Sequence, residues 1–224
     1  MEKLIFLLIA VAVAYISYRQ YQKDKQTKTE AAQPLGLNAA PPANDLETWV
    51  AGLDLQPWKT PRYQADHLSE RPFPNGKLFL LDLYDLSGDG TRHHQVAAIN
   101  APGLRLPKFG LHPRRGRGLL AQIVPWATWM NDKEVKFPAH PDFAARYAVR
   151  AEDPEAVRRF FVETELPGFL VGRDHITLRA EGDFFLFADE NPQFDPGNPE
   201  HLNRRLQGAV SVFRQFRRMN AANG

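Results

Sequence analysis

The sequence predicts an α+β fold: an N-terminal transmembrane helix, then one domain with an antiparallel sheet of β-hairpins and a long C-terminal amphipathic helix. Three observations predict this fold class. Residues 4–18 are uncharged and almost entirely apolar, two pairs of strand-like runs are each joined by a short glycine turn, and residues 198–218 repeat apolar side chains every three or four positions. Hairpins with helices grouped late in the chain are typical of antiparallel α+β domains.

The chain has 224 residues, which allows one sizeable domain with extensions. We expect three parts: a transmembrane anchor at 1–21, a flexible Ala/Pro-rich tether at 22–43 and a single α+β domain at 44–224. The tether is predicted because polar and charged residues follow the apolar run, and because the alanines and prolines after them show no apolar periodicity.

The apolar run at 4–18 would span about 22 Å as a helix, and extension to Tyr21 adds about 5 Å toward the ~30 Å hydrocarbon core of a bilayer. Lys3 and Arg19 flank the run, where long basic side chains reach the headgroups. Two alternatives stay open. Residues 12–14 fit the small-residue cleavage pattern of a signal peptide, and an apolar run of this length also occurs in buried core helices.

Basic residues are more frequent after the apolar run than before it. Those that follow it are Arg19, Lys23, Lys25 and Lys28. Before it stand Lys3 and the free amine, offset by Glu2. By the positive-inside rule, the C-terminal domain is expected in the cytoplasm, and a periplasmic domain is the alternative.

Two hairpins are predicted, the first from the strand-like runs 78–86 and 91–99. Residues 85–90 also match the first half of an EF-hand calcium loop. Position 12 of that loop would be Val96, which has no ligand atom, and strand-like runs flank it, so we interpret the segment as a turn. The second hairpin is predicted within residues 175–188.

Helix signals are clearest in the C-terminal third. Asp153-Pro154-Glu155 combines an N-cap, a proline at the first helical position and an acid in the first turn. Pro167 opens a second short helix, and Asn198 caps the long amphipathic one. Earlier in the domain, residues 44–53 predict a short helix. Asn44 or Asp45 is its N-cap, and apolar side chains recur every three or four positions after it.

The order of these pieces resembles a group of uncharacterised bacterial membrane-anchored domains of the DUF3137-like kind, in which LPxFxLxP is followed by FxxxYxVxxxD, a Val-Arg helix start and a hairpin. The match covers residues 78–218 and rests on the segment Leu106–Pro113 (LPKFGLHP), on Phe143, Tyr147, Val149 and Asp153, and on Val157-Arg158 and Phe160-Phe161. The resemblance implies a membrane-tethered domain and brings no activity with it. We expect a single-pass protein of the bacterial inner (cell) membrane.

The sequence contains no recognisable catalytic, cofactor-binding or metal-binding motif. Cysteine is absent, and there is no P-loop, G-x-G-x-x-G, G-x-S-x-G or H-E-x-x-H pattern. Asp82 and Asp85 lie three apart on a predicted strand and so face opposite sides, which makes them a poor acid/base pair. We therefore expect a domain that acts by non-catalytic interaction, with an enzyme whose site is unrecognised as the alternative.

Basic residues form two groups that are candidates for contact with an anionic surface. They are Arg105, Lys108, Arg114, Arg115, Arg117, Arg214, Arg217 and Arg218. Pro107 and Pro113 exclude a central strand through the first group, so it is expected to pack along an edge. Anionic lipid headgroups beside the anchor are the expected contact, and an ordinary solvated surface is the alternative.

The expected partners are the membrane, through residues 4–21, and an unknown protein. Nucleic acid is not expected, because the net charge is only +2 and aromatic side chains do not interleave with the basic groups.

Overall fold

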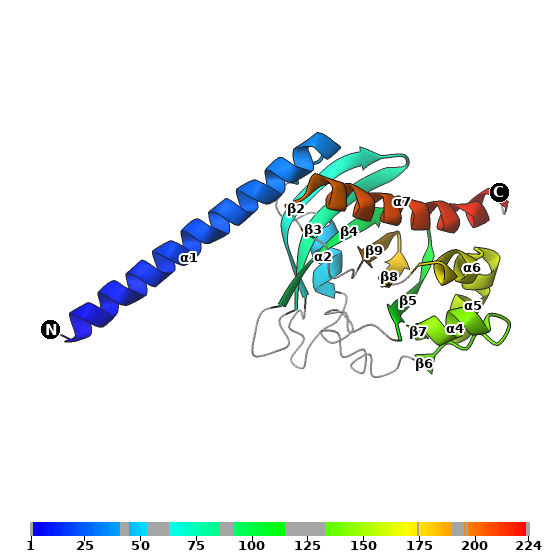
Figure 1. The fold of residues 1–224 in the computed structure, drawn as a ribbon. Coiled ribbons are helices and arrows are strands. Elements are labelled where there is room, and N and C mark those ends of the chain that lie inside the picture. The colour runs from blue at the N-terminus through cyan, green and yellow to red at the C-terminus, as the bar shows by residue number, and fades with distance from the viewer. Residues whose placement is uncertain are drawn as a thin grey trace.

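The structure is a computed structural model that describes residues 2–40, 45–52, 63–85, 92–114, 133–173, 175–189, 195 and 197–222. The strands form one nine-stranded antiparallel sheet in the order β1-β2-β3-β4-β9-β8-β5-β7-β6 (Figure 1). The α+β class, the antiparallel sheet and the C-terminal helix are thus confirmed. The strands are β1 (Asn38–Ala39), β2 (Tyr63–Phe73), β3 (Gly76–Asp85), β4 (Arg92–Asn100), β5 (Leu106–Pro113), β6 (Lys133–Glu134), β7 (Tyr147–Ala151), β8 (Ile176–Gly182) and β9 (Phe184–Asp189).

Most helices lie where the sequence predicts them. They are α1 (Glu2–Ala32), the 3-10 turn η1 (Gln33–Leu35), α2 (Asp45–Gly52), α4 (Pro141–Arg146), α5 (Pro154–Glu163), α6 (Leu166–Val171) and α7 (Pro199–Ala222). The Asp153 side chain accepts hydrogen bonds from the amides of Glu155 and Ala156, which confirms the predicted cap of α5.

Both predicted hairpins are present as strand pairs. β3 and β4 pair from Lys77↔Asn100 to Asp85↔Arg92, and β8 pairs with β9. The connection between β3 and β4 lies outside the described residues. Val96, at the last position of the rejected calcium loop, is a buried strand residue.

The two faces of the sheet carry separate cores, because side chains alternate along each strand. One core lies under α7 and includes Phe109, Phe185 and Phe216. The other is smaller and packs α2, through Leu46 and Val50, on the opposite face. In Figure 1, α7 crosses over the sheet, while α4, α5 and α6 gather beside β5 and β7.

The expectation that the two prolines keep residues 106–113 out of the sheet interior is wrong. β5 lies between β8 and β7. Pro107 falls within a register shift between Leu106 and Phe109, and Pro113 lies beyond Leu111, where the pairing with β8 ends. Each proline therefore stands where a missing amide hydrogen costs no ladder hydrogen bond on the β8 side.

Residues 22–39 contain helix and strand in the segment for which the sequence predicts a flexible tether. α1 runs without a break to Ala32, η1 follows, and β1 then pairs with β2. Ala31, Ala32 and Leu37 are buried against the main core. The reason is that residues 20–32 contain no proline or glycine, so nothing stops the helix, and the small alanines permit close approach to the sheet.

The first half of α1 projects away from the domain (Figure 1). Among the described residues, no helix combines the length and the apolar character that crossing a bilayer requires. The transmembrane assignment of residues 1–21 therefore stays a prediction.

Candidate functional site

The structure describes six of the eight basic residues singled out from the sequence. Arg115 and Arg117 lie outside the described residues. Lys108 and Arg114 lie on and just after β5, six positions apart, which is about 20 Å along a strand. Arg217 lies near the end of α7, and its guanidinium stands 5.9 Å from the centre of the Phe213 ring.

Several of these candidates are engaged within the domain. Arg114 donates to the carbonyls of Ala144 and Tyr147 and forms an ion pair with Glu134. Lys108 lies 3.6 Å from Glu181, and Arg218 lies 3.4 Å from Glu165. Arg105 and Arg214 have exposed side chains.

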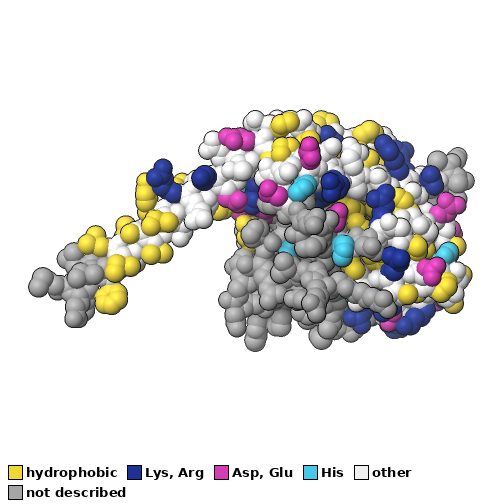
Figure 2. Space-filling model, viewed as in Figure 1, with side chains coloured by type: hydrophobic (Ala, Val, Ile, Leu, Met, Phe, Trp, Pro, Cys, Tyr) yellow, Lys and Arg dark blue, Asp and Glu magenta, His cyan; other side chains and the backbone are white. Residues whose placement is uncertain are grey.

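A group of ionisable side chains lies close together where α1 meets the sheet. We call it the junction cluster; its members are Tyr21, Asp24 and Lys28 of α1, Asp66 and His67 of β2, and Asp82 of β3. Figure 2 shows acidic and basic side chains on the surface near the point where α1 leaves the domain. The three α1 members are spaced by three and four positions, so they share one face of the helix.

Asp82 is the centre of the junction cluster. Lys28 Nζ donates to Asp82 Oδ2 over 2.7 Å, and His67 Nδ1 lies 2.5 Å from the same oxygen. The side chains of Lys28, His67 and Asp82 are 7%, 4% and 1% exposed, respectively. An ion pair this deeply buried holds α1 against β2 and β3.

The pKa values of the two charged groups reflect this pairing. Burial by itself raises the pKa of Asp82, but hydrogen bonds from His67 and Lys28 outweigh burial and leave the pKa below its ordinary value. Burial likewise lowers the pKa of Lys28, while hydrogen bonds to Asp24 and Asp82 raise it above its ordinary value. Both groups are therefore charged at neutral pH.

An outer layer closes over this pair. Asp24 Oδ2 lies 2.6 Å from Lys28 Nζ, on a side chain that is 52% exposed. The Tyr21 hydroxyl donates to Asp66 Oδ2 over 3.0 Å, and the Tyr21 ring lies 5.1 Å from the His67 ring. His67 takes a left-handed φ of 50° within an irregularity of the β2–β3 pairing, and this places its ring against α1.

A second buried cation lies behind Asp82. Arg205 of α7 is 5% exposed and donates to the carbonyls of Gln95 and Asp189. Gln95 is the cross-strand partner of Asp82. Burial lowers the pKa of Arg205 to about 10, and the charges of Asp189 and Asp82 oppose that shift. α7 thus approaches the same part of the sheet as α1.

Asp24, His67 and Asp82 are the residues of the junction cluster that can hold a metal ion. One ligand atom from each lies within 4.8 Å of the others. His67 Nε2 and Asp82 Oδ1 are buried and have no hydrogen-bond partner in the part of the chain that the structure describes. Aspartate and histidine can act as general acids or bases, but in this structure Asp82 is held in contacts with Lys28 and His67.

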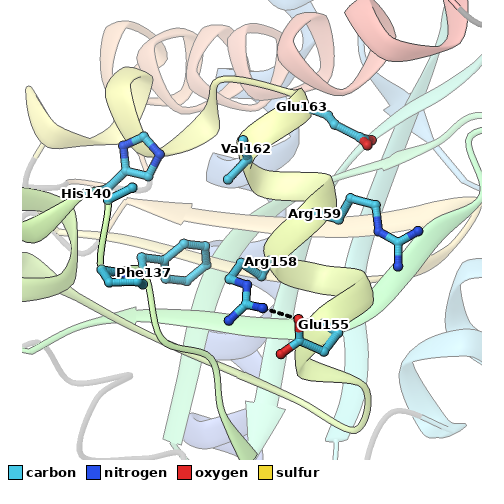
Figure 3. Close-up of a pocket in the computed structure, with 9 residues that line it drawn as sticks. Phe137, His140, Glu155, Arg158, Arg159, Val162 and Glu163 are labelled. Atoms are coloured by element: carbon cyan, nitrogen blue, oxygen red, sulfur yellow. Dashed lines mark hydrogen bonds and ion pairs between the residues drawn. The ribbon is translucent and has the colours of Figure 1, made fainter.

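A second candidate is an open pocket of about 520 Å³ between α5 and residues 137–140. Figure 3 shows Val162 and Arg158 on the side of α5 that faces Phe137 and His140, while Arg159 and Glu163 extend from its other side. Arg158 pairs with Glu155. Charges of both signs line this pocket and do not converge on one point, so its chemistry is less defined than that of the junction cluster.

The comparisons with known proteins do not extend this description. No protein-family model matches the chain, and neither the curated proteins nor the solved structures contain a significant match. The DUF3137-like resemblance therefore stays a prediction.

Sequence reasoning missed the junction cluster. It assigned Lys28 to a mobile tether and considered Asp82 only as a partner of Asp85. One signal pointed to Asp82: it shares strand parity with Leu78 and Leu80, whose side chains are buried in the main core. A carboxylate on the core-facing side of β3 needs a buried cation as its partner, but no pattern in the sequence shows that Lys28 supplies that cation.

Proposed function

We propose that the protein is a single-pass membrane protein, anchored by the first half of α1, whose α+β domain acts by non-catalytic contact with a partner. The observation that carries the proposal is the exposure of the apolar half of α1. The large exposed side chains there are Phe6, Leu7, Leu8, Ile9, Val11, Val13, Tyr15, Ile16 and Tyr18.

The arrangement of these side chains favours a lipid environment over a groove on another protein. They occupy successive positions, so they surround the helix instead of forming a stripe. A helix that docks in a groove or lies in the membrane interface needs one polar face, whereas a helix that is apolar all round needs apolar surroundings on every side.

The second half of α1 makes the anchor rigid. From Arg19 to Lys28 the helix rises by about 13 Å, and Lys28 is tied to Asp82 of the sheet. A domain attached in this way has a defined height and orientation above the bilayer. We place that domain on the cytoplasmic side of a bacterial inner membrane, because basic residues follow the apolar run.

The anchor is tested by membrane association. The full chain, expressed in bacteria, is expected in the membrane fraction after a carbonate wash and with liposomes on flotation. Ile9→Asp combined with Val13→Asp should release it, because an acidic side chain near the centre of a spanning helix costs about 3 kcal/mol. The matched control is Val162→Asp, which changes a domain residue that is 49% exposed.

The outcome that refutes the anchor is an unmodified chain that stays soluble after lysis and ignores liposomes. Orientation is tested separately with C-terminal reporters that are active only in the cytoplasm or only in the periplasm. Activity of the periplasmic reporter alone would reverse the proposed topology without affecting the anchor.

A further inference from the structure

We propose that the junction cluster is a binding site for a divalent transition-metal ion, which Asp24, His67 and Asp82 hold in place of the Lys28 ammonium. The ligands come from three elements, α1, β2 and β3, and their ligand atoms already lie within 4.8 Å of one another. This site is independent of the proposed membrane anchor.

Two buried atoms at the site have no partner among the described residues. They are His67 Nε2 and Asp82 Oδ1, on side chains that are 4% and 1% exposed. A buried polar atom without a hydrogen bond is costly and is rare in folded proteins. An imidazole nitrogen and a carboxylate oxygen are both donors that a metal ion uses.

The charges at the site also favour a divalent cation. Two carboxylates, those of Asp24 and Asp82, contact the ammonium of Lys28, and a third, that of Asp66, accepts a hydrogen bond from Tyr21 and lies 4.0 Å from His67 Nε2. The guanidinium of Arg205 lies behind Asp82 but directs its hydrogen bonds to backbone carbonyls. The carboxylates at the site outnumber the ammonium, and a divalent ion balances this excess of negative charge better than an ammonium does.

The Lys28 ammonium occupies the space between two of the three ligands. Its Nζ lies 2.6 Å from Asp24 Oδ2 and 2.7 Å from Asp82 Oδ2, between the two carboxylates. A zinc ion binds oxygen and nitrogen ligands at about 2.0–2.2 Å, so binding draws the three ligands closer and displaces the ammonium along its flexible stem. The donor set contains nitrogen and oxygen and no thiolate, because the chain has no cysteine, and it suits Zn²⁺ and its spectroscopic substitute Co²⁺.

The experiment measures Zn²⁺ binding to the metal-free full chain in mild detergent by titration calorimetry, and Co²⁺ coordination by visible absorption. We expect one ion per chain. His67→Gln and Asp24→Asn should each weaken binding by about 100-fold or more, since loss of an outer-shell partner alone costs 10–100-fold. His140→Gln is the control for adventitious binding, because His140 lies in the separate pocket beside α5.

Lys28→Met separates this proposal from a purely structural role for the cluster. It keeps an apolar stem of similar length and removes the competing charge, so Zn²⁺ should bind more tightly than to the unmodified chain. The variant should also lose stability in chelator and recover it when Zn²⁺ is added. The proposal is overturned if neither protein binds an ion, if His67→Gln leaves binding unchanged, or if Lys28→Met weakens it.

Discussion

Asp82→Asn tests how strongly the buried ion pair holds α1 to the sheet. The substitution keeps the size of the side chain and removes its charge, which leaves the Lys28 ammonium buried with one carboxylate partner. Asp24→Asn is a matched control, because it makes the same chemical change in the other carboxylate that contacts Lys28. The two carboxylates lie 2.7 Å and 2.6 Å from Lys28 Nζ, but their side chains are 1% and 52% exposed.

The burial difference sets the expected magnitudes. Removing one partner of a buried ion pair costs about 3–5 kcal/mol, and we expect about 3 kcal/mol for Asp82→Asn because Lys28 keeps Asp24. The Asp24 carboxylate is half exposed and therefore screened by solvent, and surface pairs four residues apart on a helix contribute about 0.5 kcal/mol, so Asp24→Asn should lower the free energy of unfolding by less than about 1 kcal/mol.

The assay is urea unfolding of the full chain in detergent with a metal chelator, followed by tryptophan fluorescence and circular dichroism. With a slope of about 2 kcal/mol/M, the midpoint for Asp82→Asn should fall by about 1.5 M and that for Asp24→Asn by less than about 0.5 M. If the two variants lose equal stability, burial does not decide the strength of the contact and the reasoning is wrong.

Three further predictions concern the rest of the domain. Burial and the charges of neighbouring arginines lower the pKa of His112 from 6.5 to about 4. Because the unfolded chain binds this proton more readily, the free energy of unfolding should fall by up to about 3 kcal/mol as the pH drops from 6.5 to about 4. His112→Gln should abolish that pH dependence in acid unfolding curves. Gly208→Ala should destabilise the domain by about 1–3 kcal/mol although alanine favours helices, because the new methyl group would lie 2.5 Å from the Phe187 ring. Gly168→Ala places its methyl group in open space and should be neutral or stabilising in the same urea assay. Asp153→Ala should cost about 1 kcal/mol in thermal or urea unfolding, since two amides of α5 lose their acceptor; no loss would contradict the capping role.

The elements that the sequence predicted correctly are those whose signals are local. The cap of α5 lies within Asp153–Ala156, and the first hairpin needs only two strand-like runs close together in the chain. The long helix α7 is visible because its apolar positions repeat over many turns. In each case the residues that define the element are neighbours in sequence, so their pattern is sufficient.

The features that the sequence did not predict depend on contacts between distant residues. Lys28 and Asp82 are separated by 54 positions, and Arg205 reaches the carbonyl of Gln95 across 110. The interior position of β5 depends on pairing with β8, which ends before Pro113. Local patterns carry no information on which distant side chain neutralises a buried charge, so the candidate site emerged only from the folded arrangement.

An ionic contact at the end of α1 explains why the helix has one fixed register against the sheet. Ala31 and Ala32 permit close approach, but two small apolar side chains would tolerate sliding. A shift by one residue rotates each side chain by about 100° and would bring Thr27 or Thr29 toward Asp82. Both hydroxyls donate to carbonyls of their own helix, over 3.0 Å and 2.8 Å, and neither carries a charge. Among registers that differ by one residue, only the observed one neutralises Asp82 through α1, so the pair helps to specify the orientation of the helix even where its net contribution to stability is small.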